Sequence, residues 1–169
     1  VWVAIHMNHH RHADTEKDPH SPRHQGLKTF ALEYDLDTSR VKWKMKHLIG
    51  DPFHMFLHKY YFGVIALWSL FLYAVGGFYL MVFLHWFPMI ISGSMSNIVN
   101  YVGHKPNWWG GYRRYNTRDD SINNWLWALP SWGETLHNNH HRKPYSYSHG
   151  EKWWEIDVGA WIVKLIKTN

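Results

Sequence analysis

Two histidine clusters with the same spacing lie near the two ends of this 169-residue chain. They read His6-x-x-His9-His10 and His137-x-x-His140-His141. Residues at positions i, i+3 and i+4 lie on one face of an α-helix, so each cluster can direct three imidazoles at one point. Imidazole is a common ligand of iron, zinc and copper. Six imidazoles arriving from two helices therefore predict a nitrogen-rich metal site.

The number of clustered imidazoles favours two metal ions over one, because a tetrahedral zinc ion takes only four ligands. The sequence has no cysteine, which excludes disulfides, thiolate zinc sites and cysteine-ligated iron–sulfur clusters. Neither cluster reads His-Glu-x-x-His, so the general base of the zinc proteases is missing. The donor set therefore favours iron, with zinc or copper as the alternatives.

A long apolar stretch separates the two clusters. Residues 60–92 are nearly free of charge. This stretch is too long for one membrane span, which needs roughly 20 residues. Two spans fit if the second continues to about Tyr101, and Gly76-Gly77 is the natural turn between them. An even number of crossings also leaves both histidine clusters on the same side of the membrane. We therefore predict an all-α integral membrane protein with a two-span hairpin at 60–102; two buried helices of a soluble protein are the alternative.

The rest of the chain fits one membrane-associated domain covering 1–169. Residues 26–59 are mixed and polar and predict short interfacial helices, whereas 159–167 predict an amphipathic surface helix. The basic residues, which give a formal net charge of +5, flank apolar segments, as at 41–46 and 112–115. The positive-inside rule then predicts that the histidine-rich cap faces the cytoplasm. No nucleic-acid-binding module is recognisable, so no nucleic-acid partner is expected.

Further residues are candidates for the site or its surroundings. Asn100 and His104 are four residues apart at the end of the second predicted span, so both can face the metal, although a capping pair is the alternative. Ligating histidines usually donate their other N–H to a carboxylate. The candidates are Asp14, Asp18 and Glu134, and Glu134 is favoured because it lies one helical turn before His137.

The remaining histidines are isolated or poorly phased and predict surface or turn positions: His12, His20, His24, His47, His54, His58, His85 and His149.

Together these motifs resemble the membrane fatty-acid desaturases, specifically the Δ9-type acyl-CoA and acyl-lipid branch. The matching segments are His6-Met-Asn-His9-His10-Arg-His-Ala-Asp14, Asn100-Tyr-Val-Gly-His104 and Trp132-Gly133-Glu134-Thr-Leu-His137-Asn138-Asn139-His140-His141. The resemblance covers essentially the whole chain and is specific as a set.

The resemblance implies an enzyme that uses O2 and two electrons to form a cis double bond in a fatty-acyl chain at a cytosolic di-iron centre. Matching positions imply seven iron ligands: His6, His9, His10, His104, His137, His140 and His141. Asn100 matches a residue that reaches one iron through water. The implied partners are a CoA- or lipid-linked acyl substrate, membrane lipids and an electron donor of the cytochrome b5, ferredoxin or rubredoxin type.

Two features depart from the family pattern. The first histidine box of the family, which supplies further ligands, has no match in this chain, so we expect an N-terminally truncated fragment that is inactive alone. The segment Ala4-Ile5 is apolar where animal acyl-CoA enzymes carry charged residues, and Met7 replaces a common arginine. These replacements favour a lipid-linked substrate and a bacterial inner-membrane enzyme.

Two other functions share part of this pattern. A di-iron membrane hydroxylase or ketolase would use the same metal chemistry but leave oxygen in the product. A non-catalytic metal-binding or transport protein would need ionisable residues within the spans, where only His85 is a candidate. The pair Asn100–His104 and the segment 132–141 favour the desaturase.

Overall fold

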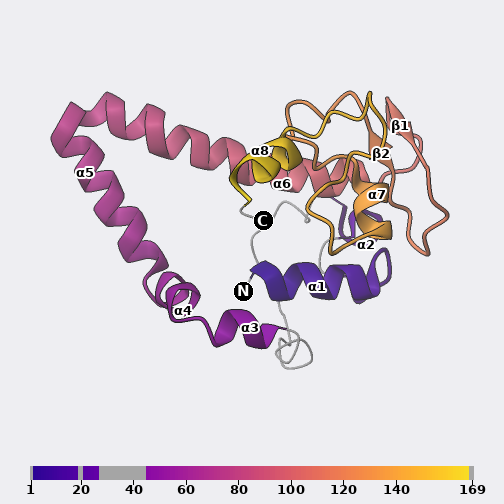
Figure 1. The fold of residues 1–169 in the computed structure, drawn as a ribbon, viewed down its shortest axis with the longest axis horizontal. Helices are drawn as coiled ribbons and strands as arrows, with labels where there is room; N and C mark the ends of the chain where they lie inside the picture. The colour runs from indigo at the N-terminus through magenta and orange to yellow at the C-terminus, as the bar shows by residue number, and fades with distance from the viewer. Residues whose placement is uncertain (1, 19–20, 27–44, 168–169) are drawn as a thin grey trace. The chain divides into compact units, whose positions relative to one another are not determined.

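The computed structural model describes residues 2–18, 21–26 and 45–167 (Figure 1). Most of its regular structure is helical, as predicted. The elements are α1 (Trp2–His12), α2 (Pro22–Gln25), α3 (Lys46–Ile49), α4 (Pro52–Lys59), α5 (Tyr61–Met81), the π-helical turn η4 (Val82–Trp86), α6 (Phe87–Gly103), β1 (Gly111–Tyr112), β2 (Asn123–Asn124), α7 (His137–Arg142) and α8 (Val158–Ile166). The chain divides into two compact units, one of residues 1–4 and 37–94 and the other of residues 5–36 and 95–169.

The first unit is built around the apolar stretch. Tyr61–Gly103 is a 43-residue helical run that is long and apolar enough to cross a membrane. Only 11% of its most apolar window is buried, which is unlike the core helix of a soluble protein. Large side chains such as Phe62 and Tyr79 are exposed instead. The crossing itself, and the predicted count of two spans, stay proposals.

The predicted turn at Gly76-Gly77 is confirmed as a break in the helix. Gly76 and Gly77 leave the helical region, with φ of −144° and +70°, and the helix axis changes direction there (Figure 1). The value at Gly77 is one that side-chain-bearing residues rarely adopt. On either side of the break, Ser69 Oγ lies 3.3 Å from His85 Nδ1. Because Ser69 donates its own hydrogen to Ile65 O, we infer that His85 donates to Ser69.

The second unit contains the histidine clusters and a small, largely polar core. Strands β1 and β2 pair antiparallel, with Gly111 opposite Asn124 and Tyr112 opposite Asn123. This hairpin departs from the all-α prediction; each strand has two residues, too few for an alternating pattern to be recognised in the sequence. Beside Leu136, the most deeply buried side chains include several amides, which the hydrogen bonds described below satisfy.

The structure describes part of the short helices predicted within 26–59 and most of the surface helix predicted at 159–167. Within 26–59, α3 and α4 are short helices as expected, whereas 27–44 lie outside the described residues. Helix α8 matches the expected surface helix: Ala160 is buried, and Leu165 is exposed. Asp157 caps it by accepting a hydrogen bond from Ala160 N at 2.9 Å.

Candidate metal centre

Seven histidines of the second unit converge in two groups. His9, His104, His137 and His141 form what we call the four-histidine group, and His6, His10 and His140 form the three-histidine group. Within each group all ligand nitrogens lie within 4.8 Å of one another. These are the seven positions expected from the sequence, and the structure brings them together.

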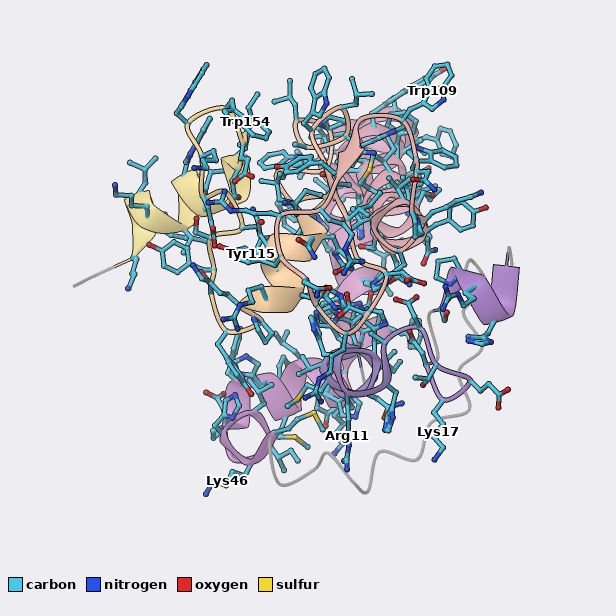
Figure 2. All side chains as sticks on the ribbon, turned by 90° about the vertical axis from the view of Figure 1, so that its right-hand side faces the viewer. Arg11, Lys17, Lys46, Trp109, Tyr115 and Trp154 are labelled. Atoms are coloured by element: carbon cyan, nitrogen blue, oxygen red, sulfur yellow. The ribbon has the colours of Figure 1, made fainter. Side chains whose placement is uncertain are left out.

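Three elements supply the groups. Helix α1 carries its histidines on one face, and its neighbour Arg11 points away from the unit (Figure 2). His104 follows the last residue of α6, and α7 begins at His137 and presents the second cluster. The i, i+3, i+4 spacing places the three rings of each cluster on one side of its helix. The prediction that each cluster meets at one point is wrong, because His6 and His10 belong to one group and His9 to the other, and the second cluster divides in the same way.

The imidazoles meet through their Nε2 atoms. In the four-histidine group, His137 and His104 are 3.0 Å apart, and His141 lies 3.2 Å from His104. In the three-histidine group, His10 Nε2 is 2.8 Å from that of His140. Nitrogens about 2.1 Å from one ion are roughly 3 Å apart when they subtend a right angle at it. The spacing of both groups therefore fits metal coordination.

Aspartates hold three of these rings from behind. Nδ1 of His9 lies 2.9 Å from Asp18, and Nδ1 of His104 lies 2.8 Å from Asp14. Nδ1 of His141 lies 3.0 Å from a third carboxylate, Asp119. An ionised carboxylate only accepts hydrogen bonds, so each of these Nδ1 atoms donates. In the neutral ring, Nε2 then carries a lone pair aimed at the centre of the group.

Burial keeps several of the clustered imidazoles neutral, as the pKa values of His10, His137 and His141 indicate. Burial, followed by the neighbouring rings, lowers the pKa of His10 to about 2 and that of His137 well below its usual range. Burial also lowers the pKa of His141 to about 4, although the hydrogen bond with Asp119 opposes this shift. Neutral imidazoles with converging lone pairs repel one another unless a cation lies between them. The donor chemistry therefore fits a metal ion in each group.

This titration predicts how the metal-free chain responds to acid. Unfolded histidine titrates near pH 6.5, whereas folded His141 titrates near 4, so the unfolded chain binds more protons between these values. Each such histidine then lowers the free energy of unfolding by up to about 1.4 kcal/mol per pH unit. We expect the thermal midpoint, followed by tryptophan fluorescence, to fall as the pH goes from 7 to 5. An unchanged midpoint would contradict the burial of neutral rings.

Gly103 allows α6 to approach the second cluster. A Cβ atom at this position would lie 2.7 Å from the His137 ring, closer than packed atoms allow. We therefore expect Gly103→Ala to displace His137 and to weaken metal binding about 10-fold or more. Gly93→Ala on the same helix is the matched control, because nothing lies within 4 Å of its Cβ position. Metal content after dialysis measures both, and equal retention would argue against this close packing.

Buried amides fix α7 in place. Asn138 Oδ1 accepts hydrogen bonds from the backbone N–H groups of Arg114 and Tyr115, at 2.9 and 2.7 Å. Figure 2 labels Tyr115 in the loop that supplies this contact. Asn139 Nδ2 donates to His149 O at 2.8 Å and to a carboxylate oxygen of Glu155 at 3.1 Å. The two residues between the histidines thus anchor the helix that carries them.

Several expected neighbours of the site need separate comment. Glu134 is exposed, and its carboxylate makes no hydrogen bond within the described part of the chain, so the favoured role given to it is corrected. It precedes α7 and does not share its ligand face. Asp14 does contact a ligand histidine, as expected. Asn100 is half-buried on α6, one turn before His104, and its water-mediated contact stays a prediction.

Sequence reasoning missed two residues beside the site. Asp119 holds His141, yet its position in a polar loop gave no sign of this contact. His149, read as a surface residue, is buried, and its ring lies 4.6 Å from that of His140 between centroids. His24 is exposed, as predicted, and its Nε2 lies 3.0 Å from Asp14 O. His20 lies outside the described residues.

Comparison with known proteins decides the family. The model of the family described as fatty acid desaturase matches residues 1–158. The chain belongs to the fatty acid desaturase family. An sn-1 stearoyl-lipid 9-desaturase of Anabaena variabilis is 36% identical to it, covering 98% of this chain and 61% of the relative. An icosanoyl-CoA 5-desaturase of Limnanthes douglasii is 38% identical, covering 98% of this chain and 47% of that protein.

A third desaturase relative comes from a plastid. A probable chloroplastic lipid desaturase of Arabidopsis thaliana is 33% identical over 98% of this chain and 46% of its own length. The desaturase chain described here thus spans about half the length of the curated relatives it matches. No solved structure matches it.

Proposed function

We propose that this chain holds the metal-ligating part of a fatty-acyl desaturase that forms a cis double bond, at the Δ9 position, using O2 and two electrons. The net change would convert a CH2–CH2 pair, O2, two electrons and two protons into CH=CH and two waters. The observation that carries the proposal is the convergence of seven Nε2 atoms in two adjoining groups, within a chain of the desaturase family.

The residues of this chain suit a di-iron centre. The four-histidine group and the three-histidine group would each hold one iron, and iron accepts imidazole ligands. When bound, such a pair of ions would activate O2, the oxidant that removes hydrogen from an unactivated acyl chain. Asn100, one helical turn before His104, would bind a water on one ion. Electrons would come from a separate donor of the cytochrome b5, ferredoxin or rubredoxin type.

The protein's own contribution is to hold and shield the centre. His9, His104 and His137 are nearly inaccessible to solvent, with 1%, 2% and 4% of their surface exposed. Exclusion of water protects reactive states from side reactions and strengthens electrostatic interactions within the site. The rings of His9, His104 and His141 are held from outside by carboxylates, so their nitrogens stay fixed where the ions would bind.

A lipid-linked acyl chain is the proposed substrate. The Anabaena relative is named as a stearoyl-lipid desaturase, although others are named for acyl-CoA. Ala4 and Ile5, which stand where CoA-contacting charges would be expected, are buried and have no charge to offer. The apolar run Tyr61–Gly103 would form the membrane hairpin, with the histidine groups on the cytoplasmic side. A bacterial inner membrane is the proposed location, and a plastid membrane is the alternative that the relatives suggest.

Expression of the complete coding gene in a desaturase-deficient host tests the proposal. Gas chromatography of total fatty acids should show a new monounsaturated peak that His140→Ala eliminates. The position of the double bond would settle Δ9 against Δ5. Hydroxylated or oxo lipids without an unsaturated product would instead indicate the related hydroxylase or ketolase. Absence of any lipid product, with the donor co-expressed, would refute both enzyme functions.

A further inference from the structure

The three histidine–aspartate hydrogen bonds of the site all fall on the same group. Asp18 contacts His9 and Asp14 contacts His104, at 2.9 and 2.8 Å. Asp119 contacts His141 at 3.0 Å. All three of these histidines belong to the four-histidine group. We call the three aspartates the carboxylate frame.

Hydrogen bonds connect the members of this frame. Asp14 N donates to Asp18 Oδ2 at 2.8 Å, and Asp14 Oδ2 also accepts from Asp120 N at 2.7 Å. The oxygen of Asp119 that does not face His141 accepts from Ser121 N at 3.0 Å. The loop after α1 and the loop at 119–121 are therefore joined behind the histidines. A shift of one ring would disturb the others.

The frame is costly to build, which indicates a specific role. The side chains of Asp18, Asp14 and Asp119 are only 0%, 4% and 13% exposed. Buried carboxylates are destabilising unless they are paired and hydrogen-bonded. Asp14 also has a φ of +61°, a left-handed conformation that non-glycine residues seldom adopt. Their common feature is contact with the outer nitrogen of a proposed ligand.

The three-histidine group is supported differently. His140 Nδ1 is buried and has no hydrogen-bond partner in the described part of the chain, which is also true of His137 Nδ1, the one ring of the four-histidine group outside the carboxylate frame. The ring of His140 packs instead against that of His149, an imidazole that cannot offer the negative charge of a carboxylate. A carboxylate on the outer nitrogen makes an imidazole a more basic ligand and fixes its orientation. The two groups should therefore bind metal unequally.

We infer that the carboxylate frame makes the four-histidine group the higher-affinity metal position, which fills first. Asp14, Asp18 and Asp119 are then positioning residues that act through His104, His9 and His141. The inference rests on the metal centre in the proposed function. It adds an order of loading and assigns a specific role to each aspartate.

Cobalt titration of the full metal-free chain in detergent tests this order. Co²⁺ bound by imidazoles absorbs visible light, so binding in competition with a chelator can be followed without enzyme activity. We expect two steps of unequal affinity. Asp119→Asn and Asp18→Asn should each weaken the tighter step by about 10- to 100-fold. The weaker step should change less than the tighter one, because Asp119 and Asp18 contact histidines of the four-histidine group.

Matched variants assign the two steps. His104→Ala should remove the tighter step and His10→Ala the weaker one. Asp51→Asn is the control, because Asp51 contacts His54 at 3.3 Å in an exposed pair outside the centre. It should change neither step. Asp119→Glu keeps the negative charge and should recover part of the affinity lost in Asp119→Asn, which a purely structural role of the side chain would not predict.

The outcomes separate the inference from the proposed function. If the unmodified chain binds no cobalt, the metal centre itself is refuted and the inference falls with it. If it binds two ions with equal affinity, or if the aspartate variants weaken both steps alike, the order of loading is wrong while the metal centre stands. Asp18 and Asp119 act on histidines from different helices, so either variant alone can decide.

Discussion

Replacement of His104 by alanine is expected to abolish desaturation. His104 Nε2 lies 3.0 Å from that of His137 and 3.2 Å from that of His141, so its ring completes the four-histidine group. The substitution also removes one of the hydrogen-bond donors of the buried Asp14, which destabilises the frame behind the group. We expect at least a 100-fold loss of product, equivalent to about 2.7 kcal/mol of lost transition-state stabilisation.

Fatty-acid analysis of cells that express the complete gene measures this effect. His58→Ala is the matched control, because His58 is an exposed histidine of α4 outside both groups. The control should produce the unmodified amount of unsaturated product, with equal protein levels checked by immunoblot. If His104→Ala kept more than about a tenth of the product, a loss far smaller than that energy implies, His104 would not be a ligand.

The histidine arrangement could be predicted from spacing because it depends mainly on local helix geometry. His6, His9 and His10 share a face of α1 for the same reason that any i, i+3, i+4 set does. The break at Gly76-Gly77 could be predicted as well, because glycine tolerates the positive φ that one of them adopts. These features require no knowledge of how distant segments pack.

The carboxylates that contact the candidate ligand histidines could not be predicted from helical spacing. Glu134 was favoured on the assumption that the helix of the second cluster extends back by one turn. Instead, Trp132 and Gly133 have φ of +60° and +102°, and α7 begins only at His137. The ring of His141 is held by Asp119, 22 residues earlier in the chain. That contact depends on loop packing, which no helical period encodes.

The burial of polar residues in the core could not be predicted from the sequence either. Asparagine is mostly a surface residue, so the Asn138-Asn139 pair gave no sign of burial by residue type. In the structure both are almost completely buried, and their amides hold loops that precede and follow α7. Their positions between the ligands leave them on the side of the helix away from the metal groups. The same helical period that directs histidines inward thus directs these amides toward the supporting loops.

Asn139→Ala is therefore expected to cause a large loss of stability. Its side chain donates to His149 O and Glu155 and accepts from Asn123 Nδ2 at 2.8 Å, all in buried surroundings. Alanine would remove the partner of His149 O and of Asn123 Nδ2, whereas Glu155 keeps the hydrogen bonds from Glu151 N and Lys152 N. Each buried unsatisfied polar group costs about 1–3 kcal/mol. A total loss of about 3–5 kcal/mol should lower the thermal midpoint by roughly 10 °C in a domain of this size.

Thermal unfolding of the purified chain, followed by tryptophan fluorescence, tests this expectation. Asn116→Ala is the matched control: it removes the same side chain from an exposed position of the same unit and should shift the midpoint by no more than about 2 °C. Metal binding provides a second measurement, since loosening α7 displaces His137, His140 and His141 together. A midpoint unchanged by Asn139→Ala would mean that water replaces the amide, and that the ligands of α7 are positioned by their metal contacts rather than by the buried asparagines.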